Sequence, residues 1–282
     1  MTAKPLSGKE LAASIREDVT ARAARLTDAG TPPRLTVVTA TKDESSAWYV
    51  SSIAKAATKA GITCDVLDCG PDAPADALRE TLRKLSADPA VHGIIMQTPL
   101  PEGIRLDDVA EAIGTDKDVD GANPSSLGRL AVGRPAFAPA TAEAVIELLD
   151  HHQIPVPASD VAVVGRSAVV GKPLAHLLLN RHATVTVCHS RTRDLPAVTE
   201  RADILVAAAG RAGLITADHV RKGAVVIDVG TNVAEDGSLV GDVAPQAAEK
   251  AAALTPVPGG VGPVTTALLL RHTVQAAEQQ RT

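Results

Sequence analysis

The feature that most constrains the fold is an alternation of short, β-branched apolar runs with longer stretches whose apolar residues recur at helical spacing. In the first half of the chain these segments are, in order, residues 35–40, 45–60, 62–67, 76–86 and 91–96. Strands that alternate with helices of this length form parallel sheets with crossover helices. A further helix should precede them, because Ser7 and Glu10 form a capping-box pattern ahead of apolar residues at helical spacing.

The same alternation resumes in the second half of the chain. We expect strands at residues 161–164, 184–188, 204–207 and 224–229, with helices between them and a final helix at 263–280. A chain of 282 residues exceeds the roughly 100–200 residues of one typical domain. The sequence therefore predicts two α/β domains. The first covers residues 1–138 and is joined by a returning C-terminal helix at 264–282, and the second is a Rossmann-type domain at 139–263.

A glycine-bounded turn at residues 165–171 separates the predicted strand at 161–164 from the next helix. Such a turn points backbone N–H groups and the helix dipole toward an anion, usually a phosphate. The spacing departs from the common G-x-G-x-x-G pattern, because Ser167 replaces the middle glycine and Gly171 comes one residue late. The strand–turn–helix context predicts a dinucleotide site, while a tight turn that only requires glycine is the alternative.

The end of the second strand in this domain indicates which dinucleotide would bind. NAD sites usually carry Asp or Glu there, about 20 residues after the turn, to hold the ribose 2′-hydroxyl. Here the strand ends in His189, Ser190, Arg191 and Thr192. A serine hydroxyl beside an arginine suits a 2′-phosphate, and Arg166 in the turn adds a second cation. We therefore expect NADP rather than NAD, with an ordinary solvated arginine loop as the alternative.

The composition excludes several classes of partner. The net charge is −5 and the chain has one Trp, one Tyr and one Phe, which argues against binding of nucleic acid. No apolar run approaches the ~20 residues of a membrane span. Residues 1–10 show no secretory signal, so we expect a cytoplasmic protein. The spacing of Cys64, Cys69 and Cys188 matches no zinc pattern, and no metal site is expected.

Motifs spread along the chain resemble those of one enzyme family. They are WYV at 48–50, QTPLP at 97–101, KDVDG at 117–121, GRS at 165–167, DVG at 228–230 and TPVPGGVGP at 255–263. Together they resemble the bifunctional methylenetetrahydrofolate dehydrogenase/methenyltetrahydrofolate cyclohydrolase family of one-carbon metabolism. The resemblance implies that the first domain binds folate and that the second binds NADP. It also implies a homodimer that oxidises methylenetetrahydrofolate and hydrolyses the methenyl product to formyltetrahydrofolate.

The resemblance assigns roles to single residues. Tyr49 corresponds to the family's pocket tyrosine, Gln97 to the glutamine beside a catalytic lysine, and Asp120 to the aspartate that hydrogen-bonds the pterin. A carboxylate suits that ring, because it accepts two hydrogen bonds at once. The other matches are the substrate-contacting Pro258, Gly259 and Gly260, and the cofactor-contacting Gly165, Arg166, Ser167, Gly171, Ser190, Arg191, Gly230 and Thr231.

The chain departs from the family pattern at the catalytic lysine. The family places that lysine four residues after the pocket tyrosine, where this chain has Ile53. Residues four apart share one helix face, so Ile53 should point into the same pocket as Tyr49. Lys55 and Lys59 are rotated from Ile53 by roughly 200° and 600° at ~100° per residue, so neither should replace the lysine. Elsewhere, His272 stands for an asparagine on the last helix.

Oxidation and hydrolysis depend differently on a lysine. Hydride transfer from the methylene carbon leaves no proton to remove, so it requires geometry rather than a general base. Hydrolysis needs proton transfers, and losing an acid–base group typically costs about 10²–10⁴-fold. The sequence therefore predicts a dehydrogenase with weak or absent cyclohydrolase activity. Three alternatives remain: a full bifunctional enzyme that uses water held by Gln97 and Asp120, an NADP enzyme for a modified pterin or another imine, and a non-catalytic folate- or nucleotide-binding paralogue.

Overall fold

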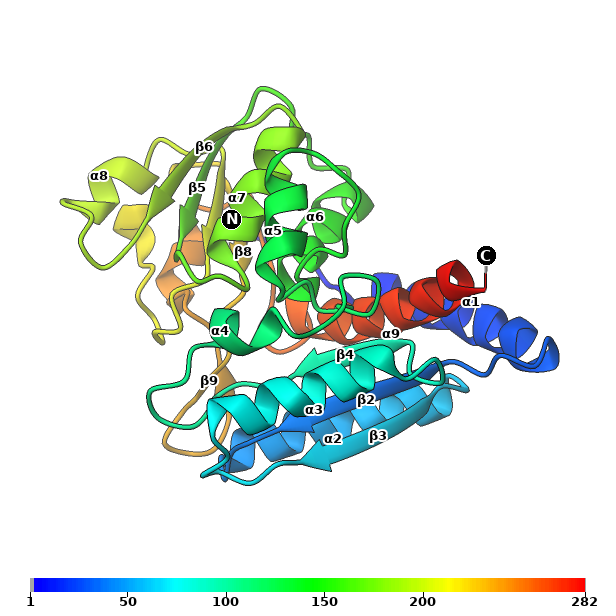
Figure 1. The fold of residues 1–282 in the computed structure, drawn as a ribbon. Coiled ribbons are helices and arrows are strands. Elements are labelled where there is room, and N and C mark those ends of the chain that lie inside the picture. Colours follow the sequence, from blue (N-terminus) through cyan, green and yellow to red (C-terminus); the bar gives the residue numbers. More distant parts are fainter. Residues whose placement is uncertain (1–2, 282) are drawn as a thin grey trace. The chain divides into compact units, whose positions relative to one another are not determined.

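The computed structural model describes residues 3–281, which divide into two compact units. The three-stranded unit contains residues 13–140 and 266–281. The six-stranded unit contains residues 3–12 and 141–265. Each unit is a parallel sheet with helices against it, so the predicted class of two α/β domains is confirmed (Figure 1).

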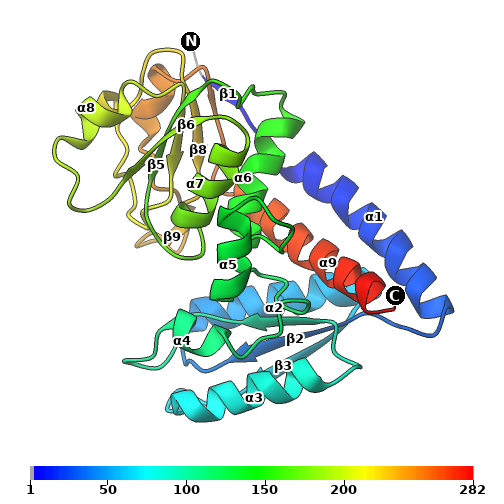
Figure 2. The ribbon, with the colours of Figure 1, turned by 45° about the horizontal axis from the view of Figure 1, so that its top comes forward.

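The sheet of the three-stranded unit has the order β3–β2–β4, with all strands parallel. Its strands and the helices that follow are β2 (Arg34–Thr39), α2 (Glu44–Lys59), β3 (Thr63–Asp68), α3 (Ala75–Ala87) and β4 (Gly93–Met96). Because the chain moves from β2 first to one neighbour and then to the other, right-handed crossovers place α2 and α3 on opposite faces (Figure 2). The carboxyl ends of β2 and β4 flank this reversal, where open α/β sheets bind ligands.

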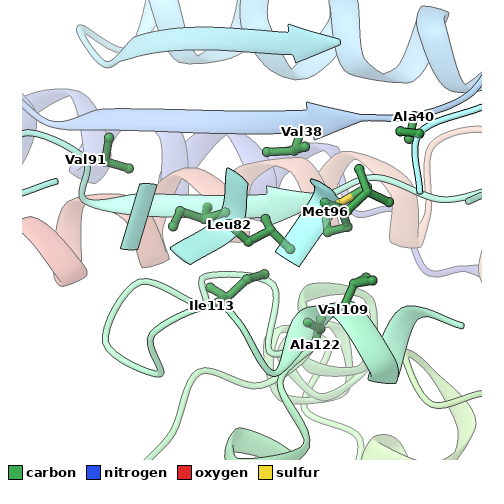
Figure 3. Packing of buried hydrophobic residues seen from close by; sticks show 12 residues of the cluster. Val38, Ala40, Leu82, Val91, Met96, Val109, Ile113 and Ala122 are labelled. Atoms are coloured by element: carbon green, nitrogen blue, oxygen red, sulfur yellow. The ribbon is translucent and has the colours of Figure 1, made fainter. Parts of the chain in front are cut away.

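A buried apolar cluster fixes one face of this sheet. Val38 of β2 and Met96 of β4 lie beside Leu82 of α3, with Val109 and Ile113 from the following segment (Figure 3). Burying a leucine fully stabilises the fold by roughly 1.5–3 kcal/mol. The cluster therefore anchors the strand ends from which the candidate site extends. Two short helices follow β4 in the chain, α4 (Leu106–Ala110) and α5 (Pro124–Ala131).

The six-stranded sheet has the order β1–β11–β8–β7–β5–β6 and is parallel throughout. Its elements are β1 (Lys4–Pro5), α6 (Ala140–His151), β5 (Asp160–Val164), α7 (Gly171–Asn180), β6 (Thr184–Cys188), α8 (Leu195–Thr199), β7 (Ile204–Ala207), β8 (Val225–Asp228) and β11 (Ala253–Leu254). A separate antiparallel pair joins β9 (Asn232–Val233) to β10 (Leu239–Val240). The strand order reverses at β5, so its carboxyl end is the expected ligand edge.

The N-terminal boundary differs from the prediction. β1 pairs with β11, and this pairing places the residues up to Ala12 in the six-stranded unit rather than in a first domain of residues 1–138. Helix α1 (Lys9–Asp28) begins two residues after Ser7, whose Oγ accepts a hydrogen bond from the backbone N–H of Lys9 at 3.3 Å.

The C-terminal helix α9 (Val261–Gln280) joins the three-stranded unit from Thr266 onward, which confirms the predicted return of this helix. Glu278 pairs with Arg22 of α1 at 2.7 Å, and Gln280 donates a hydrogen bond to the carbonyl of His92 at 3.2 Å. Among residues 3–281, no helix has the length and apolar character that crossing a membrane requires.

Candidate active site

Tyr49 lies on the second turn of α2. The helix starts at Glu44 because the side chain of Asp43 caps it, accepting a hydrogen bond from the backbone N–H of Ser46 at 2.7 Å. The Tyr49 phenol is partly buried and hydrogen-bonded to Thr266 of α9. Burial, together with the nearby charge of Asp120, raises the pKa of the phenol. Tyr49 therefore stays neutral at physiological pH.

Asp120 follows a segment that runs beside β4. Asp118 pairs with Ile94 as an isolated parallel bridge, so the segment lies alongside the edge strand β4. Burial raises the pKa of Asp120 to about 6, and the charge of Asp118 contributes. The backbone N–H of Ala140, which donates to the carboxylate at 3.3 Å, opposes that shift. The structure thus brings Tyr49 and Asp120 together, as the resemblance implied.

Gln97 lies directly after β4, but its side chain is turned back on its own loop. The Nε2 amide donates to the carbonyl of Thr98 at 2.7 Å, and the hydroxyl of Ser46 approaches the same oxygen at 3.3 Å. Within the described residues, no hydrogen bond joins Gln97 to Tyr49 or Asp120. The Gln97 amide therefore stabilises the 97–101 loop, at the end of the strand that runs beside the 118–120 segment.

Ile53 is completely buried, with 0% of its surface exposed. It lies on the face of α2 that also buries Val50 and Ala57. The sequence predicted that Ile53 would point into a pocket, but the side chain is packed in the interior and exposes no surface to one. Lys55 and Lys59 are exposed, which agrees with their expected rotation away from Ile53.

The turn at residues 165–171 connects β5 to α7 in the six-stranded unit. Gly165 has φ of +138°, and a Cβ there would overlap the carbonyl of Ala208, so only glycine fits. A Cβ on Gly171 would likewise overlap the carbonyl of Gly165. The hydroxyl of Ser167 accepts from the N–H groups of Val170 and Gly171, at 3.1 and 3.4 Å. The turn is therefore compact at the start of a helix, which suits binding of a phosphate.

The cations near this turn are exposed and suited to binding an anion. Arg166, Ser190 and Arg191 are all exposed. None of the ion pairs found among residues 3–281 includes Arg166, Arg191 or Arg193. The backbone N–H of Arg191 donates to His189 Nδ1 at 3.1 Å, which closes the short turn after β6. This arrangement fits an anionic group such as a 2′-phosphate.

Two buried aspartates, Asp228 and Asp242, organise the loops after β7 and β8. The sequence did not identify either as a site residue. The carboxylate of Asp242 accepts from the backbone N–H groups of residues 209, 210 and 211 at 2.6–2.9 Å. The carboxylate of Asp228 accepts from the N–H groups of Gly230 and Asp242 at 2.9 Å each. Burial raises the pKa of Asp228, although these hydrogen bonds oppose the shift. Gly230 is therefore held in place, whereas Thr231 next to it is exposed.

The segment from Pro258 to Gly260 precedes α9, and its glycines are required by the chain itself. The carbonyl of Gly259 accepts from the N–H of Gly8 at 2.9 Å, and the stem of Lys9 lies over Gly259. A Cβ on Gly260 would approach the carbonyl oxygen of Pro256 to 2.7 Å. Close approach of folate or nicotinamide is thus not needed to explain these glycines.

Comparison with known proteins matches two stretches of the chain to the two domains of one family. Residues 6–120 match the family model for the tetrahydrofolate dehydrogenase/cyclohydrolase catalytic domain, and residues 139–281 match that for the NAD(P)-binding domain of the same family. The chain belongs to the tetrahydrofolate dehydrogenase/cyclohydrolase family. Bifunctional protein FolD 1 of Saccharopolyspora erythraea is 62% identical over 277 residues, which cover 98% of this chain and 94% of that relative.

Solved structures of this family have the same fold. The bifunctional enzyme FolD of Campylobacter jejuni superposes with a TM-score of 0.95 at 39% identity, covering 98% of this chain and 99% of that one. The FolD of Trypanosoma brucei, complexed with NADP cofactor and an inhibitor, gives 0.93 at 35% identity, covering 99% and 98%. The family resemblance predicted from the motifs is confirmed.

Proposed function

We propose that this protein oxidises 5,10-methylenetetrahydrofolate to 5,10-methenyltetrahydrofolate with NADP⁺ and hydrolyses the methenyl product weakly or not at all. The oxidation follows from membership of the family in both domains. The loss of hydrolysis rests on one observation, the buried Ile53 at the position of the family lysine. The cytoplasm is the proposed location and a homodimer the proposed assembly, both carried over from sequence and family.

Substrate would be held by the pair of Tyr49 and Asp120. The ionised carboxylate of Asp120 can accept hydrogen bonds from the ring N–H and amino donors of a pterin. The neutral phenol of Tyr49 offers an aromatic face and a hydrogen-bonding tip beside that carboxylate. These groups position the substrate, and none of them has to accept a proton for oxidation to occur.

The cofactor would lie along the carboxyl edge of the six-stranded sheet. The backbone N–H groups of the 165–171 turn would hold its pyrophosphate, and Ser190 and Arg191 its 2′-phosphate. The bound nicotinamide supplies hydride acceptance. Preference for NADP over NAD rests on the absence of an acidic residue at the end of β6 and on the exposed cations there. The NADP complex of the Trypanosoma brucei relative supports this choice.

Hydrolysis requires groups that this chain lacks at the expected place. Water must add to the methenyl carbon, lose a proton, and a ring nitrogen must leave as an amine. Ile53 can neither donate nor accept a proton, and the exposed Lys55 and Lys59 lie on other faces of α2. We therefore expect turnover to stop at the methenyl product, which then hydrolyses spontaneously.

A full bifunctional enzyme is the second candidate, because relatives at about 60% identity are named bifunctional FolD proteins. It would need water held by Gln97 and Asp120, yet the Gln97 amide is engaged by Thr98. A non-catalytic binding paralogue would bind NADP⁺ without turnover.

Measuring NADPH formation from methylenetetrahydrofolate, with NAD⁺ in a parallel reaction, tests the oxidation and the cofactor preference together. NADPH should form at a rate proportional to the protein, with slower turnover of NAD⁺. Binding of NADP⁺ without NADPH formation would contradict the proposal and favour the non-catalytic alternative. Failure to bind tetrahydrofolate would indicate another substrate.

A further inference from the structure

His272 lies on α9 with 3% of its surface exposed. Its Nδ1 is 2.7 Å from the carbonyl oxygen of Val119. A carbonyl oxygen only accepts hydrogen bonds, so Nδ1 must carry a proton and donate it. The ring also packs against Phe137, with centroids 5.2 Å apart and planes at 39°. The imidazole is thus fixed in position, with a proton on Nδ1.

The carbonyl that His272 binds belongs to the peptide group that joins Val119 to Asp120. Its orientation therefore determines the direction in which the backbone enters Asp120. On the preceding side, the N–H of Ile94 in β4 donates to the carbonyl of Lys117 at 2.8 Å. The Asp118 carboxylate accepts from the N–H groups of Ala122 and Asn123, each at 2.9 Å. His272 restrains the peptide group between Val119 and Asp120 through its hydrogen bond to the Val119 carbonyl.

The charge environment agrees with this geometry. The buried carboxyl group of Asp118 and the partly buried carboxyl group of Asp120 flank the peptide that His272 contacts. Burial raises the pKa of both carboxyls, and His272 counteracts the rise at both. The other groups that shift these two pKa values are neutral hydrogen-bond donors, which lower them, and the charge of Asp118, which raises the pKa of Asp120. This effect is coulombic and belongs to the imidazolium form of the ring, whereas the hydrogen bond from Nδ1 to Val119 is made by either form.

We propose that His272 is a positioning residue, which fixes Asp120 for substrate binding through the hydrogen bond from Nδ1 to the Val119 carbonyl. This inference rests on the proposed role of Asp120 in holding folate. His272 itself need not touch the substrate. The sequence pattern marked it only as a replacement for the family's asparagine, and the contact explains why either residue serves. The amide nitrogen of asparagine lies the same number of bonds from the backbone as Nδ1 of histidine.

Three substitutions separate this role from ordinary packing. His272→Asn keeps an N–H donor at the Nδ1 position, His272→Gln moves the donor one bond further out, and His272→Leu removes it. The dissociation constant for tetrahydrofolate should rise roughly 5- to 50-fold in the Leu and Gln variants, as expected for a lost buried hydrogen bond, and about 3-fold or less in His272→Asn. KM should follow the dissociation constant, with a smaller change in kcat.

Glu278→Ala is the matched control for stability. It removes the ion pair with Arg22 from the same helix without touching the 118–120 segment. It should lower the melting temperature and leave the affinity for tetrahydrofolate unchanged. In the Asp120→Asn background, His272→Leu should weaken binding no further, because its effect acts through Asp120.

Two results would overturn the inference while wild-type protein binds tetrahydrofolate. One is unchanged affinity in folded His272→Leu and His272→Gln proteins. The other is a His272→Asn variant as weak as His272→Leu, which would show that the donor at Nδ1 is not what matters. Wild-type protein that fails to bind tetrahydrofolate at all would instead overturn the proposed function, and this inference with it.

Discussion

The phenol of Tyr49, on helix α2, interacts electrostatically with the carboxylate of Asp120, which follows the segment beside β4. Burial contributes most to the raised pKa of Tyr49, and the charge of Asp120 adds to it. Thr266 of the C-terminal helix hydrogen-bonds the same phenol. Three segments distant in sequence therefore meet at one polar cluster, and this cluster carries the proposed folate site.

Asp120→Asn should stabilise the protein at neutral and higher pH while weakening folate binding. The pKa of Asp120 is about 6 in the folded protein, above its ordinary value of 3.8. Between these values the folded state holds a proton that the unfolded state has released, so stability falls as pH rises through this window. Above about pH 6 the ionised carboxyl lowers the free energy of unfolding by up to about 3 kcal/mol. Urea unfolding at about pH 4 and about pH 8 measures the effect. A variant no more stable than wild type at the higher pH would contradict it.

Arg191→Ala should weaken binding of NADP⁺ roughly 10- to 100-fold, the loss expected for a charge-assisted contact to a phosphate. Binding of NAD⁺ should change by about 2-fold or less, because NAD⁺ lacks the 2′-phosphate. Titration with both nucleotides at one salt concentration measures the two affinities. Arg134→Ala, an exposed cation in the other unit, is the control. Equal losses for both nucleotides would show that Arg191 does not read the 2′-phosphate.

Asp242→Ala should destabilise the six-stranded unit by about 3 kcal/mol or more, because it leaves three backbone N–H groups at residues 209–211 without their buried acceptor. It should also weaken cofactor binding, since the same carboxylate orders the loop after β7. Thermal unfolding and NADP⁺ titration measure the two effects. Asp236→Ala removes an exposed carboxylate that caps a nearby turn, and it should change neither by much. Similar results for the two variants would refute the assigned role of Asp242.

Ile53→Lys should lower stability by several kcal/mol, because it introduces an ammonium where the structure has a fully buried isoleucine. Ile53→Leu, which conserves volume, should cost less than about 1.5 kcal/mol. Lysine is longer than isoleucine, so in the fraction of Ile53→Lys that folds the amine should extend from the buried position toward Tyr49, four residues earlier on α2. That fraction should hydrolyse methenyltetrahydrofolate faster than wild type. Folded variant with an unchanged dehydrogenase rate and no gain in hydrolysis would show that this position does not account for the missing activity.

Local patterns predicted the strands β2 to β8 but not the two-residue strands β1 and β11. The β-branched run at residues 35–40 became β2, a central strand whose middle residues are buried, and the run at 184–188 became β6, a largely exposed edge strand. The short helices α4 and α5 were not predicted. Each is brief, and α5 depends on the cap from Asn123 and on Pro124 at its first turn rather than on a periodic pattern.

Local sequence patterns could not predict the contacts between segments that are distant in the chain. β1 joins β11 across most of the chain, so the first residues could not be assigned to the correct unit. Asp242 has no distinguishing motif, since its partners are backbone N–H groups of another loop. The resemblance assigned Tyr49 and Asp120 to one folate site, and in the structure the charge of Asp120 influences the Tyr49 phenol. It did not show that Gln97 turns back on Thr98 or that Ile53 is packed in the interior.

The most direct test of the central claim follows two signals in one reaction of pure wild-type protein with methylenetetrahydrofolate and NADP⁺. NADPH and methenyltetrahydrofolate are recorded separately, and a protein-free sample of methenyltetrahydrofolate gives the rate of spontaneous hydrolysis. We predict that NADPH forms, that the methenyl compound accumulates, and that it decays at the spontaneous rate. Formation of NADPH with clearance of the methenyl compound faster than in the control would contradict the account, because hydrolysis would then proceed without the lysine.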